Sequence, residues 1–126
     1  LNEEGKPIVQ DGKLPMGTLE TYRDWGFAGD YVEAMWRILN HTKPDDFVVA
    51  SGIEHTIRDF CEEAFSYLGL DYKKYVVQDP AFIRPSEIEH MYGDPSKAKK
   101  ELGWRPKVDF KNLVRMMVDS EMAVFK

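Results

Sequence analysis

Two short segments place an arginine where it could bind an anion. Arg23 stands at the junction between an extended segment and a helix, and Arg84 precedes Pro85, which keeps its predecessor extended. A guanidinium fork matches two phosphate oxygens better than the point charge of a lysine does. Two such forks from separate segments could hold a diphosphate, and Glu87, three residues after Arg84, could accept hydrogen bonds from vicinal hydroxyls. Arg23, Arg84 and Glu87 are therefore the candidate substrate-binding residues.

A structural role explains the same two arginines equally well. Each has acidic residues nearby in the sequence and could form an internal ion pair instead of binding a ligand. The candidate partners are Asp24 or Asp30 for Arg23, and Glu87 or Glu89 for Arg84. The residues alone leave the binding interpretation and the structural interpretation open.

Histidine and cysteine give no pattern typical of a metal site or of a nucleophile. His41, His55 and His90 are far apart and lack the spacing of metal ligands, so we expect no metal. Cys61 falls on the apolar stripe of an expected helix, which favours a buried structural thiol. The sequence contains neither a Tyr-x-x-x-Lys pair nor a Gly-x-Ser-x-Gly turn, and we expect no catalytic residue in this chain.

The run Gly26-Phe27-Ala28-Gly29 before a helix matches a phosphate-binding loop only in part. Val32 stands where the dinucleotide-binding pattern requires its third glycine. The residues before the run are charged, unlike those of a buried parallel strand. The run therefore predicts a turn into the helix.

Composition indicates one domain with its own core. The chain has 126 residues, of which 43% are hydrophobic and 31% charged, and a formal net charge of -5. The negative sign argues against nucleic acid as a partner, and no apolar run is long enough to span a membrane. A single cysteine and the lack of a signal-peptide pattern predict a reducing, cytoplasmic compartment. Because the sequence begins at Leu1 rather than Met, we expect a piece of a longer protein.

The elements that must position the candidate residues predict a mixed, helix-rich α/β fold. We expect residues 1–16 to form a loop or extended segment and residues 17–126 to form a single lobe. Short extended or strand segments are expected at 19–25, 47–50 and 75–77.

Start and stop signals predict where three helices lie. Thr56 and Asp59 have capping-box spacing, with Asp in place of the usual Glu, and this helix is expected to end at Gly69. Asp94-Pro95 is expected to begin a short helix that runs to Leu102, with Gly103 just past it. Asp109 is expected to cap the last helix.

Apolar spacing predicts which faces of two helices point inward. In the helix after residue 27 the inward stripe would consist of Ala28, Tyr31, Val32, Met35, Ile38 and Leu39. In the last helix the inward residues would be Phe110, Leu113, Val114, Met117 and Met122.

Several of these segments also carry a family resemblance. The run 23–36, with the letters RDWGFAGDYVEAMW, resembles the corresponding stretch of GDP-mannose 4,6-dehydratases, which belong to the extended short-chain dehydrogenase/reductase group. The resemblance continues through 44–48, 84–87, 93–98 and 102–106 and covers nearly everything from Gly17 to Met122. Family members often have His at the position of Phe27 and Lys at that of Gly29, and we assign no role to either position.

The resemblance implies roles for the candidate residues. Full-length relatives have a Rossmann half that binds NADP and holds the catalytic residues, and this chain resembles the remainder, the small C-terminal substrate-binding lobe. The Rossmann half, and with it NADP, is therefore expected to lie outside this chain. By carry-over, Arg23 and Arg84 would contact the diphosphate of a nucleotide sugar, and Glu87 would contact its ribose.

The resemblance also implies an activity for the parent enzyme. That enzyme would convert GDP-mannose to GDP-4-keto-6-deoxymannose by oxidation, dehydration and re-reduction, and would be a homo-oligomer. This chain by itself would be inactive. The alternatives are a lobe of a related nucleotide-sugar epimerase or reductase, and a non-enzymatic module that binds a nucleotide sugar.

Overall fold

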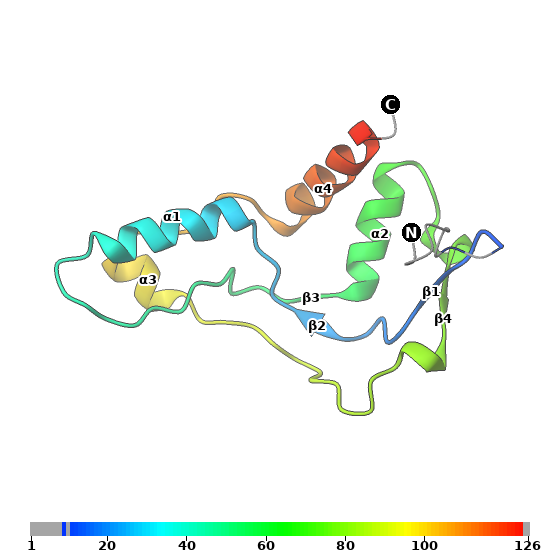
Figure 1. Ribbon diagram of the computed structural model, residues 1–126, viewed down its shortest axis with the longest axis horizontal. Helices are drawn as coiled ribbons and strands as arrows, with labels where there is room; N and C mark the ends of the chain where they lie inside the picture. Colours follow the sequence, from blue (N-terminus) through cyan, green and yellow to red (C-terminus); the bar gives the residue numbers. More distant parts are fainter. Residues whose placement is uncertain (1–8, 10, 125–126) are drawn as a thin grey trace.

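The chain folds into short helices and two small sheets. The computed structural model describes residue 9 and residues 11–124. The elements, in chain order, are β1 (Leu14–Met16), β2 (Tyr22–Arg23), α1 (Ala28–Leu39), β3 (His55–Thr56), α2 (Ile57–Tyr67), η1 (Tyr72–Lys74), β4 (Val76–Gln78), η2 (Pro80–Phe82), α3 (Ser96–Glu101) and α4 (Phe110–Val124) (Figure 1). This is the mixed, helix-rich α/β architecture that the sequence predicts, and the absence of a Rossmann half from the chain stays a prediction.

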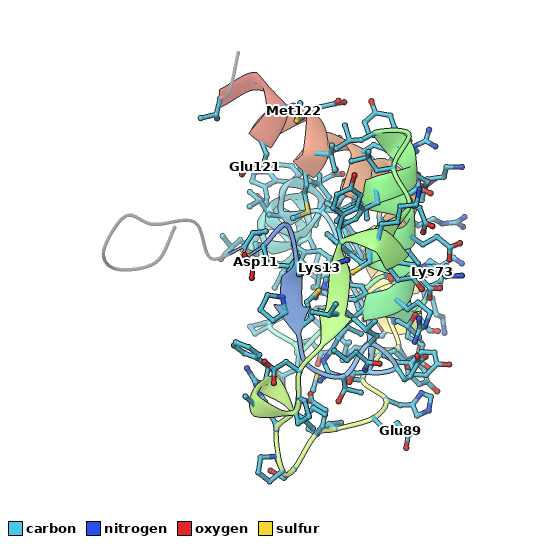
Figure 2. The ribbon with its side chains drawn as sticks, turned by 90° about the vertical axis from the view of Figure 1, so that its right-hand side faces the viewer. Asp11, Lys13, Lys73, Glu89, Glu121 and Met122 are labelled. Carbon is cyan, nitrogen blue, oxygen red and sulfur yellow. The ribbon has the colours of Figure 1, made fainter. Side chains whose placement is uncertain are left out.

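The two sheets differ in direction and place. β1 and β4 pair in parallel, with Leu14 opposite Val76, and lie side by side in Figure 2. β2 and β3 pair antiparallel, with Tyr22 opposite Thr56 and Arg23 opposite His55. β1 falls within the segment expected to be a loop or extended, of which residues 1–8 and 10 lie outside the described residues. The boundary at residue 17 stays a prediction.

Two separate clusters of buried side chains hold these elements together. The first lies between α2 and the parallel sheet and consists of Leu19, Cys61, Tyr72 and Val76. The second lies between α1 and α3 and consists of Ala34, Ala98 and Trp104. Figure 1 shows α1 and α3 together at one end of the molecule and α2 with the β1–β4 sheet at the other.

The predicted capping signals are confirmed at both ends of α2. The Thr56 hydroxyl accepts a hydrogen bond from Asp59 N at 3.0 Å, and the Asp59 carboxylate accepts one from Thr56 N at 2.8 Å. Gly69 has a φ of +72°, and Leu70 N donates to Phe65 O at 2.9 Å, which is the Schellman arrangement.

The signals for the other two helices are confirmed with a small shift. Asp109 Oδ1 accepts a hydrogen bond from Asn112 N at 2.8 Å and so caps α4. α3 begins at Ser96 rather than at Pro95, which is the N-cap, and the Asp94 carboxylate accepts a hydrogen bond from Ser96 N at 2.9 Å. Gly103, with a φ of +62°, follows its end as predicted.

The strand expected at 47–50 is wrong. None of the described segments pairs with these residues, and they run as irregular chain between α1 and β3. Phe47 and Val49 pack against the second cluster, whereas Val48 is 53% exposed. The apolar run is therefore explained by packing of its alternate residues and not by a hydrogen-bonded strand.

The inward stripe expected for α1 is wrong at four of its six positions. Val32, Met35 and Leu39 are exposed at 61%, 59% and 84%, and Ala28 is exposed as well. The helix instead buries Asp30 and Ala34, because the described chain covers α1 only on the side where Trp104 packs.

The stripe expected for α4 is partly right. Leu113 and Val114 are buried as predicted, but Met117 and Met122 are exposed at 49% and 43%. α4 nevertheless lies along α2 as far as Asp119, whose carboxylate accepts a hydrogen bond from the Tyr67 hydroxyl at 3.0 Å. Met117 and Met122 line a cavity of about 290 Å³ together with Phe60 and Leu68, and Figure 2 shows Met122 near the far end of α4. The two methionines therefore face an open cavity rather than a packed core.

Candidate functional site

The three candidate residues meet at one cavity. Arg23, Arg84 and Glu87 all line a cavity of about 260 Å³. The rest of its wall is formed by Met16, Gly17, Thr18, Thr21, Ile57 and Phe82. Folding thus brings Arg23 to Arg84 and Glu87, which follow it in the sequence by 61 and 64 positions.

Arg23 is held at this cavity by the β2–β3 ribbon. Side chains alternate along an extended chain, so Thr21 and Arg23 share a face and both reach the cavity. Arg23 Nη1 donates to Tyr22 O at 2.5 Å and to Ile88 O at 2.8 Å. Arg23 Nη2 forms an ion pair with Glu87 Oε1.

The pairing differs from the sequence-based alternatives. The sequence offered Asp24 or Asp30 as a partner for Arg23, and Glu87 or Glu89 as a partner for Arg84. Glu87 pairs instead with Arg23 across 64 positions. Figure 2 shows Glu89 at the edge of the molecule with its side chain directed outward.

The Asp24 carboxylate is unavailable to Arg23 because it holds the ends of two loops. It accepts backbone hydrogen bonds from Ser51 N at 2.9 Å, from Gly52 N at 2.8 Å and from Gly93 N at 3.3 Å. These bonds fix the chain on either side of the Arg23 ribbon.

The Asp30 carboxylate is likewise used by the fold. It is buried, with 5% exposure, and accepts from Lys107 N at 2.8 Å and from Val108 N at 3.0 Å. Its backbone oxygen accepts from Trp104 Nε1 at 2.8 Å. Asp30 therefore joins the start of α1 to the chain after Trp104 and is not part of an arginine pair.

Arg84 differs from Arg23 in its hydrogen bonding. The residues described include no hydrogen-bond or ion-pair partner for its guanidinium, and the residue is exposed. A guanidinium carries several N–H donors in a planar fork and stays charged at any physiological pH. Arg84 is thus a cation at a cavity wall with its fork open to an anionic ligand.

Arg84 and Glu87 lie on an irregular segment, residues 84–92, which we name the strap. Every residue of the strap is exposed, and it crosses below β2 between η2 and α3 (Figure 1). Tyr22 N donates to Glu89 O at 2.9 Å, and Asp24 N donates to Met91 O at 3.1 Å. β2 therefore sets the position of the strap through main-chain hydrogen bonds.

Three further wall residues were not singled out from the sequence. Thr18 and Thr21 carry hydroxyls at the cavity, and their i, i+3 spacing near Arg23 was the available signal. Gly17 brings its backbone against η2, where a Cβ would lie 2.5 Å from Phe82 O. A larger residue at position 17 would push the two walls apart.

Arg23 also borders a second cavity, of about 370 Å³, whose wall includes Tyr31 and Tyr92. Burial raises the pKa of the Tyr31 hydroxyl, and the nearby carboxylates of Asp24 and Asp30 raise it further. Tyr31 is therefore a neutral hydrogen-bonding group there and not a base.

Cys61 is confirmed as a buried thiol. It is 5% exposed in the first cluster, and its Sγ lies 3.8 Å from Met16 Sδ. Burial raises the pKa of this thiol, which lowers the thiolate population that a nucleophile requires.

The start of α1 does not fit a dinucleotide. A Cβ at Gly26 would lie 2.1 Å from the Tyr31 hydroxyl, and one at Gly29 would lie 2.3 Å from the Phe27 ring. The chain's own side chains therefore occupy the space beside these glycines, and the strand before them is antiparallel, unlike that of a dinucleotide-binding turn. The predicted turn into the helix is confirmed, and we derive no step through NADP from the described residues.

Two further findings concern metals and membranes. The described residues include no group of three or more His, Cys, Asp or Glu side chains that could hold a metal ion. Within the same residues, none of the helices has the length and apolar character needed to cross a bilayer.

Known proteins similar to this chain point to one family. The sequence profile of the family described as GDP-mannose 4,6 dehydratase matches residues 8–117. GDP-mannose 4,6 dehydratase 2 of Arabidopsis thaliana is 53% identical over 114 residues, which cover 90% of this chain and 31% of that protein. GDP-mannose 4,6 dehydratase of Homo sapiens is 38% identical over 128 residues, covering 88% of this chain and 34% of that protein.

A solved structure shows the same fold. RMD of Pseudomonas aeruginosa, complexed with NADPH, matches with a TM-score of 0.76 and 25% identity over 87% of this chain and 36% of that one. The chain thus spans about a third of the length of the relatives it matches.

Proposed function

Because the chain belongs to the GDP-mannose 4,6-dehydratase family, we propose that it supplies the nucleotide-sugar-binding part of such an enzyme. The whole enzyme would convert GDP-mannose to GDP-4-keto-6-deoxymannose through oxidation, dehydration and re-reduction. The groups that carry out these steps, and NADP, would lie elsewhere in the enzyme. This chain's part is to bind and orient the substrate.

The meeting of Arg23, Arg84 and Glu87 at one cavity supports this proposal. Arg84 offers an open guanidinium fork to the diphosphate, and Arg23 offers a second guanidinium already oriented by Ile88 O. Glu87 lines the same cavity and would accept hydrogen bonds from the ribose hydroxyls. The nucleotide end of the substrate does not react. Binding that end would position the hexose for the reaction steps.

Binding would exchange the partner of Arg23. In the structure Glu87 occupies Arg23 Nη2, and a phosphate oxygen would take its place. Both side chains are about one quarter exposed, so this solvent-screened ion pair is worth only about 0–1 kcal/mol. A charge-assisted hydrogen bond to a ligand contributes about 1.5–3 kcal/mol. The exchange would replace one charge-assisted hydrogen bond of Arg23 by another, and it would release the Glu87 carboxylate for the ribose.

Product analysis tests the proposed activity. The full-length protein that carries this chain is incubated with GDP-mannose and NADP, and the product is identified by mass spectrometry and NMR. We expect a 4-keto-6-deoxy sugar nucleotide that has lost one molecule of water. A product of unchanged mass, or turnover of UDP-sugars in place of GDP-mannose, would instead assign the chain to an epimerase or to another nucleotide sugar.

A further inference from the structure

The strap is tied to β2 on two opposite faces. Because side chains alternate along an extended chain, Arg23 and Tyr22 point to opposite sides of the ribbon. On the cavity side, Arg23 holds the strap through Glu87 and Ile88. On the other side, the Tyr22 ring stacks on His90, with ring centroids 4.4 Å apart and an interplanar angle of 17°.

Glu54 completes the tie on the second face. His90 Nδ1 lies 2.8 Å from Glu54 Oε1, and Glu54 immediately precedes β3. The contact therefore joins the strap to the other strand of the β2–β3 ribbon. Glu54 Oε2 is buried and has no hydrogen-bond partner among the described residues. The contact of His90 with Oε1 is therefore the hydrogen bond that offsets the cost of burying this carboxylate.

The contact of Tyr22, Glu54 and His90, which we name the clasp, lies outside the cavity. None of its three residues belongs to the cavity wall that Arg23, Arg84 and Glu87 share. A ligand bound in that cavity would therefore not contact the clasp. The clasp would, however, stay closed when a diphosphate displaces Glu87 from Arg23, which leaves the hydrogen bond to Ile88 O as the other tie that Arg23 makes on the cavity face.

We propose that Glu54 and His90 are positioning residues of the nucleotide site. They hold the strap in the register that brings Arg84 and Glu87 to the cavity, both before and during the exchange at Arg23. This inference rests on the proposed function. Neither residue was connected to the site by its sequence position, since 36 positions separate them.

Kinetics of variants of the full-length protein test the clasp. His90→Ala removes the hydrogen bond and the ring contact, and we expect the KM for GDP-mannose to rise about fivefold while kcat changes less than about twofold. Glu54→Gln keeps the shape of the side chain and should raise KM by less than His90→Ala does. His90→Asn keeps a donor near the position of Nδ1 and should restore KM toward the wild-type value.

A matched control uses a histidine with similar contacts away from the cavity. His41 lies edge-on to Phe47, with ring centroids 5.4 Å apart, and its Nδ1 lies 2.8 Å from Lys43 O. His41→Ala should leave KM unchanged. A rise in KM as large as that of His90→Ala would mean that loss of any histidine contact perturbs the enzyme, and would overturn the inference.

Arg84→Ala in the same assay separates the two proposals. If Arg84→Ala raises KM but His90→Ala only lowers the melting temperature, the clasp is structural and this inference is overturned while the proposed function stands. An unchanged KM in both variants overturns the proposed function and this inference with it. If His90→Ala yields no folded protein, Glu54→Gln decides, because an unchanged KM in that variant also overturns the inference.

Discussion

Arg37 and Arg84 line two different cavities, and the protein uses their guanidinium groups in opposite ways. At the C-terminal end of α1, Arg37 lines a cavity of about 380 Å³. Its Nε and Nη2 donate to Glu33 at 3.1 and 2.6 Å, and its Nη1 donates to Leu102 O at 2.8 Å. At the smaller cavity, of about 260 Å³, Arg84 has no partner among the described residues.

The difference shows that cavity size does not identify a binding site. The guanidinium of Arg37 donates hydrogen bonds from all three of its nitrogens, so its donors are already used by the protein. Arg84 has no partner among the described residues, and the partner of Arg23 Nη2 is a Glu87 carboxylate that a ligand could replace. The Arg37 end is therefore a structural region, and the Arg84 region is the one suited to bind an anion.

The largest expected effect concerns stability at the structural end. Trp104 is 1% exposed, packs on Ala34 and Ala98, and donates to Asp30 O. Trp104→Ala should lower the free energy of unfolding by about 4 kcal/mol, because it leaves a cavity and an unpaired acceptor. Thermal and urea unfolding of the full-length protein measure this loss.

Trp36 provides the control for that substitution. It is 65% exposed and lines the Arg37 cavity. Trp36→Ala should change stability by less than about 0.5 kcal/mol. A large loss in Trp36→Ala, or none in Trp104→Ala, would break the division between the two regions.

The next effect concerns binding. Arg84→Ala should weaken binding of GDP-mannose by about 1.5–3 kcal/mol, because a charge-assisted hydrogen bond to the diphosphate is lost. Arg84→Lys should weaken binding by less than Arg84→Ala does, since lysine keeps the positive charge but lacks the guanidinium fork. Arg37→Ala should leave affinity unchanged. Calorimetric titration with GDP-mannose compares the three variants, and equal losses in Arg84→Ala and Arg37→Ala would remove the distinction between the cavities.

A smaller effect sharpens the account of Arg23. Glu87→Gln removes the charge that occupies Arg23 Nη2, so inorganic pyrophosphate should inhibit the enzyme up to about fivefold more strongly. GDP-mannose, which also carries a ribose, should bind less tightly because the amide is a weaker acceptor. Inhibition constants for pyrophosphate and KM values for GDP-mannose are measured in parallel. Changes of the same sign for both ligands would contradict the exchange.

The smallest effect is the acid sensitivity of the structural end. Hydrogen bonds from Lys107 and Arg37 hold the pKa of Glu33 below its ordinary value. A carboxylate with a lowered pKa in the folded state stabilises the protein above its unfolded pKa, near 4.3, and loses that contribution as the pH falls further. The stability difference between the wild type and Glu33→Gln should therefore shrink below about pH 4. Urea unfolding at pH 7 and pH 3.5 measures it, and a difference that does not depend on pH would be inconsistent with the pairing.

Much of the local structure follows from short sequence patterns. The Thr56–Asp59 box, the left-handed Gly69 and the Asp109 cap were all predicted and are confirmed. Each depends on groups within a few residues of one another, whose relative positions are set by helical geometry. The buried position of Cys61 followed from apolar periodicity in the same way.

The periodic pattern was a poorer guide where burial depends on a neighbouring element. Met35 and Met117 stand at apolar positions of their helices and are nevertheless exposed at 59% and 49%. The segment 47–50 has the composition of a strand and lacks a partner in the described part of the chain. Burial and strand pairing each require a second segment that packs or pairs with the first. An apolar pattern in one segment shows only that the segment could be covered, not that a partner is present.

For the site, the sequence by itself determined the residue types: two arginines before turns or prolines and a glutamate three positions after the second. Only the tertiary structure decided that Glu87 pairs with Arg23, that Arg84 stays open, and that His90 meets Glu54 on the opposite face of the ribbon. The reason is physical. Contacts within one turn are set by backbone geometry, whereas an ion pair across 64 positions depends on which segments the packed core brings side by side.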